Sequence, residues 1–113
     1  MSDAVRQFKA QILQALAHPT RIAIVEALRD GEVGAGALLT QTGVEQANLS
    51  QHLAVLRSRQ LVVSRKVGNQ VFYAVRDAVL IDVLDSLKQY ISSHVQDMLA
   101  TLGELDDAAR DPL

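Results

Sequence analysis

The sequence predicts a mainly α-helical domain with one small β-hairpin, its elements in the order ααααββα. Apolar residues recur with helical period before residue 59 and again after residue 77. Between these regions, two runs rich in Val, Phe and Tyr flank Gly68-Asn69, which is typical of a β-hairpin. With 113 residues, 49% of them hydrophobic and 21% charged, the chain has the size and composition of one globular domain.

Composition excludes several classes of site. The sequence contains no cysteine, which excludes disulfides, thiolate metal sites and redox thiols. No basic-then-apolar leader and no run approaching the ~20 apolar residues of a membrane span are present, so we expect a cytoplasmic protein. The net charge is −2, but residues 57–76 contain no acid and five basic side chains: Arg57, Arg59, Arg65, Lys66 and Arg76.

The first two helices are predicted on either side of Pro19. Residues 4–16 form an amphipathic helix whose apolar positions are Val5, Phe8, Ile12 and Leu16. Pro19 cannot continue that helix but suits the first position of the next one, which runs to about Arg29. This second helix buries Ile22, Val25 and Leu28.

A helix-turn-helix is predicted over residues 35–59, after a loop or frayed start at residues 32–36. Gly43 can adopt the left-handed backbone that ends its first helix. In the second helix, Leu49, Leu53 and Leu56 form one buried stripe. The residues away from that stripe are short, polar and uncharged, which suits contact with base edges in a major groove: Gln46, Ala47, Ser50, Gln51 and Ala54.

The β-hairpin that follows is predicted over residues 61–67 and 70–75, with Arg65 and Lys66 just before its tip. A basic hairpin directly after a recognition helix is the wing of a winged helix. These two side chains could be a charged sheet edge that prevents aggregation, but phosphate contact is the favoured interpretation. Arg57 and Arg59 could either interact with the end of the recognition helix or reach phosphate.

A long last helix is predicted from an N-cap at Asp77 to about Leu102, some 39 Å at 1.5 Å per residue. Its apolar stripe is too long for this domain to cover, so we expect it to pair with a second copy of the chain, together with the first helix. Gly103 is predicted to end it, which divides the chain into a domain of residues 1–103 and an acidic, disordered tail of residues 104–113. The stripe consists of Leu80, Leu84, Leu87, Ile91, Val95, Met98 and Leu102.

Two segments, LAHPTRIAIVEAL and TGVEQANLSQHLAVLRSRQLVVSRKVGNQVFYAV, resemble the ArsR/SmtB family of bacterial winged-helix repressors. The likeness covers about residues 8–100 and is greatest to the branch without the usual metal-binding cysteines. It implies a homodimer built from the first and last helices. Such a dimer binds an inverted-repeat operator near its own promoter, represses its own or a neighbouring operon, and leaves the DNA when an effector arrives.

The resemblance also implies which residues contact double-stranded DNA. The family's base-contacting positions correspond to Gln46, Ala47, Asn48, Ser50 and Gln51, and its wing contacts to Arg65, Lys66, Asn69 and Gln70. The chemistry of these side chains agrees, because Gln46 and Gln51 can each pair bidentately with adenine and Ala47 can touch a thymine methyl. His52 is expected to hydrogen-bond within the turn or to phosphate.

No metal or other cofactor is expected. The segment that carries Cys-Val-Cys in metal-sensing relatives is Gly34-Ala35-Gly36 here, which has no ligand atoms. A second family site, between the paired last helices, retains one ligand of four, at Asp77, Val79, Tyr90 and Ser93. The three histidines, His18, His52 and His94, are not expected to be neighbours. His94 and Asp97 share a helix face that dimer symmetry could double, but a solvated face is the favoured interpretation.

An enzyme is not expected, because the sequence has no glycine-rich phosphate loop, cysteine nucleophile or Ser-His-Asp set. The alternative function is a winged-helix adaptor that binds a protein instead of DNA. An apolar outward face on residues 46–54 would favour the adaptor, whereas the face in this sequence is rich in amides. The effector could be a small organic ligand, a metal at a new site or a partner protein, or there could be none.

Overall fold

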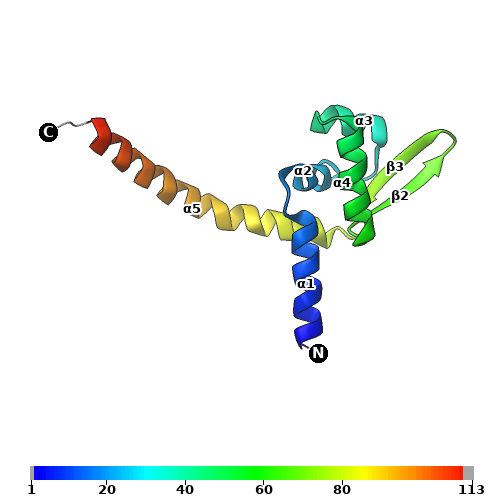
Figure 1. The fold of residues 1–113 in the computed structure, drawn as a ribbon, viewed down its shortest axis with the longest axis horizontal. Coiled ribbons are helices and arrows are strands. Elements are labelled where there is room, and N and C mark those ends of the chain that lie inside the picture. Colours follow the sequence, from blue (N-terminus) through cyan, green and yellow to red (C-terminus); the bar gives the residue numbers. More distant parts are fainter. Residues whose placement is uncertain (1, 111–113) are drawn as a thin grey trace. The chain divides into compact units, whose positions relative to one another are not determined.

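The computed structural model describes the backbone of residues 2–110 and the side chains of residues 2–105. The chain divides into two compact units, Met1–Ile81 and Asp82–Leu113. In chain order the elements are α1 (Ser2–Leu16), α2 (Pro19–Ala27), β1 (Val33–Gly34), α3 (Ala35–Thr42), α4 (Gln46–Ser58), β2 (Val62–Val67), β3 (Gln70–Val75) and α5 (Val79–Arg110). Figure 1 labels all of these except β1.

The core of the first unit lies where α2, α3 and α4 meet β2. Its largest fully buried side chains come from these elements: Ile24, Val25, Leu38, Leu56 and Val62. Gly43 ends α3 with φ +67°, and α4 begins three residues later. The predicted helix-turn-helix is therefore confirmed, including its left-handed glycine.

The start of α2 is also as predicted, with Pro19 at its first position. The N-cap is His18, whose Nδ1 accepts a hydrogen bond from the backbone N–H of Thr20 at 3.1 Å. A histidine in this role satisfies a backbone donor that the helix itself leaves unpaired. The His18 ring is consequently held at the junction between α1 and α2.

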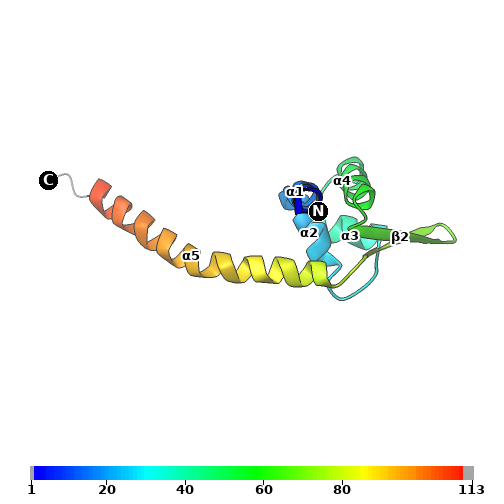
Figure 2. The ribbon, with the colours of Figure 1, turned by 90° about the horizontal axis from the view of Figure 1, so that it is seen from below.

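The sheet has three antiparallel strands in the order β1-β3-β2, so the predicted hairpin is confirmed but incomplete. The expectation of a loop or frayed start at residues 32–36 is wrong, because Val33 and Gly34 pair with Tyr73 and Phe72. A strand of two residues is too short to show a period, and its partner lies far along the chain. The tip of the hairpin projects away from the helices of the first unit, in both Figure 1 and Figure 2.

The long helix α5 starts as predicted, since Asp77 Oδ1 accepts a hydrogen bond from the N–H of Val79 at 2.9 Å. The prediction that it ends at Gly103 is wrong, because the helix continues to Arg110. The segment 104–110, predicted as part of a disordered tail, is therefore helical, and residues 111–113 lie outside the described residues. An internal glycine costs a helix only about 1 kcal/mol relative to alanine, which good helix formers on both sides can offset.

Apolar side chains are exposed along two helices of the chain. On α1 these are Val5, Phe8 and Leu13. On α5 the exposed apolar residues between positions 83 and 105 are Val83, Leu87, Tyr90, Ile91, Val95, Met98, Leu99, Leu102 and Leu105. In spite of these residues, no helix in the described part of the chain is long and apolar enough to cross a membrane.

Candidate nucleic-acid interface

The recognition helix α4 has one buried side and one exposed side. Leu49, Leu53 and Leu56 are at most 4% exposed, as the sequence predicts. All the residues predicted to face away from this stripe are exposed, as is Asn48: Gln46, Ala47, Ser50, Gln51 and Ala54. The outward surface of α4 thus presents amides, one hydroxyl and methyl groups, which together match the donors, acceptors and thymine methyls of a major groove.

His52 differs from the other predicted contacts because it is half-buried. Arg21 Nε donates a hydrogen bond to His52 Nδ1 at 3.3 Å, and the His52 ring lies 4.3 Å from that of His18, centroid to centroid. The expectation that the histidines are not neighbours is therefore wrong for this pair. Packing of α2 against α4 brings together residues that are far apart in the sequence.

The environment of His52 favours its neutral form. Burial lowers the pKa of His52, and the nearby charges of His18 and Arg21 lower it further. In the neutral ring Nδ1 accepts the bond from Arg21, so Nε2 carries the proton and remains the one donor available to a phosphate. The same Arg21 donates from Nη1 to the carbonyl oxygen of Ala15 at 2.9 Å, at the end of α1. Arg21 thereby joins α1 to the middle of the recognition helix.

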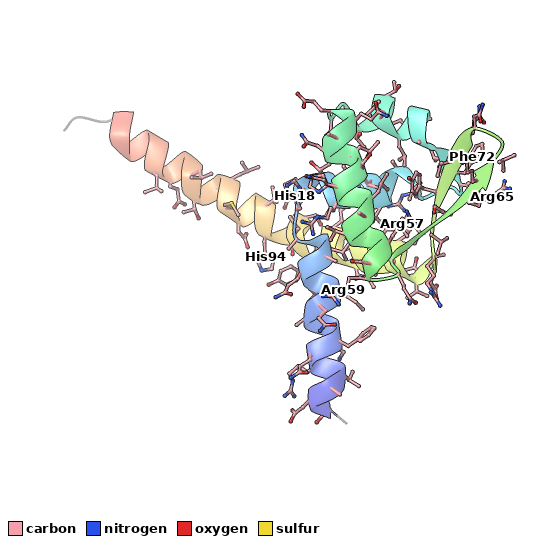
Figure 3. The ribbon with its side chains drawn as sticks, turned by 45° about the vertical axis from the view of Figure 1, so that its right-hand side comes forward. His18, Arg57, Arg59, Arg65, Phe72 and His94 are labelled. Carbon is pink, nitrogen blue, oxygen red and sulfur yellow. The ribbon has the colours of Figure 1, made fainter. Side chains whose placement is uncertain are left out.

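The wing carries an ion pair that the sequence does not predict. Arg65 donates from Nε and Nη2 to the two carboxylate oxygens of Glu32, at 2.6 and 2.7 Å. Its guanidinium lies 5.5 Å from the centre of the Phe72 ring, and the two side chains are labelled on the hairpin in Figure 3. The hydrogen bonds from Arg65 lower the pKa of Glu32, and the carboxylate raises the pKa of Arg65. A phosphate that binds Arg65 must therefore compete with Glu32.

The other predicted wing contacts lie at the end of the hairpin. Lys66, Asn69 and Gln70 are all exposed, and Gly68 supplies the positive φ of +60° that the tight turn requires. Arg57 and Arg59 are exposed at the C-terminal end of α4, where Figure 3 labels them. Arg59 Nη1 donates to Gln11 Oε1 of α1 at 3.3 Å, whereas Arg57 lines a hollow on the side of β2.

Among the described side chains, no group of three or more His, Asp and Glu residues is placed to hold a metal ion. His94 packs on its own helix, with Nδ1 2.9 Å from the carbonyl oxygen of Tyr90 and its ring stacked on the Tyr90 ring. The prediction for His94 and Asp97 stays a solvated helix face, with a site shared by two chains as the alternative.

Sequence reasoning missed Arg21, Glu32 and the role of His18. Arg21 stands in the Pro-Thr-Arg start of α2, which carries the family resemblance, but nothing local indicates that it reaches α4. Glu32 lies before the helix-turn-helix and has no local partner. The contacts of both residues join positions more than 30 residues apart.

Comparison with known proteins agrees with this geometry. A family model described as a helix-turn-helix domain matches residues 16–65. The HTH-type transcriptional regulator Rv0081 of Mycobacterium tuberculosis is 33% identical over 105 residues, 92% of each chain. The crystal structure of that regulator superposes with a TM-score of 0.76 over 84% of this chain and 96% of its own.

Two further relatives are named for what they do. The biofilm growth-associated repressor of Xylella fastidiosa is 37% identical over 78 residues, which are 69% of this chain and 68% of the repressor. The solution structure of the homodimeric winged helix-turn-helix DNA-binding domain of Mb0332 from Mycobacterium bovis, a possible ArsR-family regulator, has a TM-score of 0.76 and 25% identity. It covers 85% of this chain and 89% of its own. The chain therefore belongs to the ArsR-type family of winged helix-turn-helix transcriptional regulators.

Proposed function

We propose that this protein is a homodimeric, sequence-specific DNA-binding repressor that an effector releases from its operator. The observation that carries this proposal is the exposed face of α4. That face presents Gln46, Ser50 and Gln51 to solvent while the leucines of the same helix are buried. Uncharged residues on a helix face contribute less to solubility than Glu or Lys would. The amide and hydroxyl groups of these residues can instead form specific hydrogen bonds with base edges.

The recognition helix contacts bases and the wing contacts phosphates. Bases are contacted by Gln46, Ala47, Asn48, Ser50 and Gln51, with Gln51 and Gln46 favouring adenine and Ala47 a thymine methyl. Phosphates are contacted by the wing, through Arg65 and Lys66 and the amides of Asn69 and Gln70, and by Nε2 of His52. These phosphate contacts hold the protein in register on the duplex without selecting its sequence.

The dimer forms through the apolar faces of α1 and α5. Exposed apolar residues follow α5 from Val83 to Leu105, and a second copy of the chain supplies a matching surface. The domain of Mb0332, to which this chain is similar, is homodimeric. Two recognition helices related by a two-fold axis enter successive major grooves about 34 Å apart, so the operator is an inverted repeat.

The biological role is repression of the protein's own operon or a neighbouring one, in the cytoplasm. The Xylella fastidiosa relative is a repressor, which supports this direction of control. The effector acts by favouring a dimer geometry in which the recognition helices are wrongly spaced for the operator. The role is one of binding and not of catalysis.

A fluorescence-anisotropy titration tests this function. The protein is titrated against the DNA upstream of its own gene and against a scrambled duplex, at several salt concentrations. We expect an affinity at least ~1,000-fold higher for the upstream duplex, with a strongly negative salt dependence. Weak and equal binding to both duplexes would contradict repression of the protein's own operon and favour a distant operator or the protein-binding adaptor.

A further inference from the structure

A cavity of about 350 Å³ lies between α1 and the C-terminal end of the recognition helix. Phe8 and Ile12 of α1 and Leu61, the residue before β2, form its apolar wall. Arg59, directly after α4, and Arg76, directly after β3, line its polar side. Its volume is at the lower end of the roughly 300–1,000 Å³ that is usual for small-molecule sites.

Two arginines give this cavity a positive charge. Arg59 Nη1 donates to Gln11 Oε1 at 3.3 Å, and Arg76 Nη1 donates to Gln60 Oε1 at 2.5 Å. Both acceptors are neutral amides, and none of the described residues that line the cavity is acidic. A guanidinium has five N–H donors and binds a carboxylate more strongly than an amide, so the cavity favours an anion.

Gln60, which follows the recognition helix, orients one of the two arginines. It is the only described residue other than glycine with a positive φ, +58°. Its position follows α4, where the N–H of Leu61 bonds back to the carbonyl of Leu56 at 2.9 Å, and glycine is the usual residue in this capping motif. The left-handed backbone is unfavourable for glutamine, and strain of this kind is found at functional sites. A glycine at this position would lack the side-chain amide that orients Arg76.

We propose that this cavity is the binding site of a small amphipathic carboxylate. The apolar body of the ligand packs on Phe8, Ile12 and Leu61, and its carboxylate accepts hydrogen bonds from Arg59 and Arg76. The large apolar wall disfavours a sugar phosphate, whose hydroxyl groups would lose their hydrogen bonds to water there.

The position of the cavity makes this ligand the effector, an assignment that rests on the proposed function. Phe8 and Ile12 belong to the helix proposed to form the dimer, and Arg59 follows the helix proposed to bind DNA. A ligand that contacts both helices binds one arrangement of them more tightly than another. It therefore shifts the population toward that arrangement and changes the affinity for the operator.

Binding is tested by nuclear magnetic resonance on the full ¹⁵N-labelled chain. The probes are benzoate, 3-phenylpropionate and octanoate, each compared with its neutral primary amide. We expect at least one carboxylate to shift the Arg59 and Arg76 Nε–H signals saturably, with a Kd below roughly 10 mM, and its amide to bind at least ~10-fold more weakly. Absence of saturable shifts with all three carboxylates, or equal binding of the amides, would overturn the proposal.

Variants locate the site. R59Q and R76Q are each expected to weaken the carboxylate at least ~10-fold. The control is R57Q, which removes the same charge from the same helix end but faces the side of β2, so its ligand affinity should be unchanged. Equal losses in R57Q and R59Q would show general charge attraction instead of a site. Q60G relieves the backbone, so it should fold with a raised Tm and still bind the carboxylate more weakly than the wild type.

DNA titrations separate the two proposals. Addition of the carboxylate should change the affinity of the wild type for the upstream duplex. The same addition should have no effect on the affinity of R59Q for that duplex. Specific DNA binding without saturable carboxylate binding would overturn the cavity proposal alone. Carboxylate binding without specific DNA binding would support the cavity and overturn the repressor, and with it the effector role.

Discussion

Glu32 is expected to compete with DNA for the wing arginine, so that E32Q strengthens DNA binding. The carboxylate of Glu32 occupies the guanidinium edge of Arg65 through two short hydrogen bonds, at 2.6 and 2.7 Å. The Arg65 side chain is 63% exposed, so a phosphate can reach it. E32Q keeps the shape of the side chain but removes the charge that holds Arg65, which leaves the guanidinium free for a phosphate.

The size of the effect follows from counterion release. In the wild type Arg65 reaches a phosphate only when its bond to Glu32 breaks. Where that bond persists in the complex, E32Q adds one phosphate contact per wing. Each such contact changes the slope of log affinity against log salt by about −0.9, so a dimer gains up to about −1.8. The advantage of E32Q over the wild type should therefore shrink by up to roughly 12-fold between 50 and 200 mM salt. Because phosphates carry no sequence information, the gain should be the same on the upstream and scrambled duplexes.

Anisotropy titrations at four salt concentrations measure this slope. The control is E26Q, which makes the same change in net charge on α2, away from the wing, and should leave the slope nearly unchanged. The double variant E32Q/R65Q should lose the gain. The reasoning is refuted if E32Q weakens binding to both duplexes, because the ion pair would then hold the wing in its binding position instead of competing with phosphate.

Five other perturbations test separate parts of the account. Q51A should weaken the upstream duplex by roughly 1–3 kcal/mol and leave the scrambled duplex unaffected, whereas K66A should weaken both duplexes and make the salt slope less negative by about 1 per wing. The pKa of His52 is lower in the folded protein than in the unfolded chain, where it is about 6.5. As the pH falls below about 6.5, the unfolded chain therefore binds a proton before the folded protein does, and the free energy of unfolding declines until the pH reaches the folded-state pKa. Urea midpoints between pH 7.5 and 5 should show this decline, and H52Q should reduce it. L56A removes a side chain with no exposed surface and should lower the free energy of unfolding by about 2–5 kcal/mol in urea titrations. I91D places a charge on the exposed apolar face of α5 and should convert the dimer to a monomer in light scattering, with loss of operator affinity.

The elements that the sequence determines by itself are those specified by neighbouring residues. The period of Leu49, Leu53 and Leu56 places the recognition helix and its outward face, and Gly43 places the turn before it. The hairpin follows from its β-branched and aromatic runs around Gly68. Each of these signals is local, because a backbone conformation or a helix face depends on residues only a few positions apart.

The features that only the tertiary structure decides join residues distant in the sequence. Arg65 meets Glu32 across 33 positions and His52 meets Arg21 across 31, in each case because strands or helices pack together. The continuation of α5 past Gly103 is different, because good helix formers next to the glycine offset its cost and no distant contact is needed. Local patterns thus place the surface proposed to contact DNA, whereas long-range packing determines which of its charges are already paired.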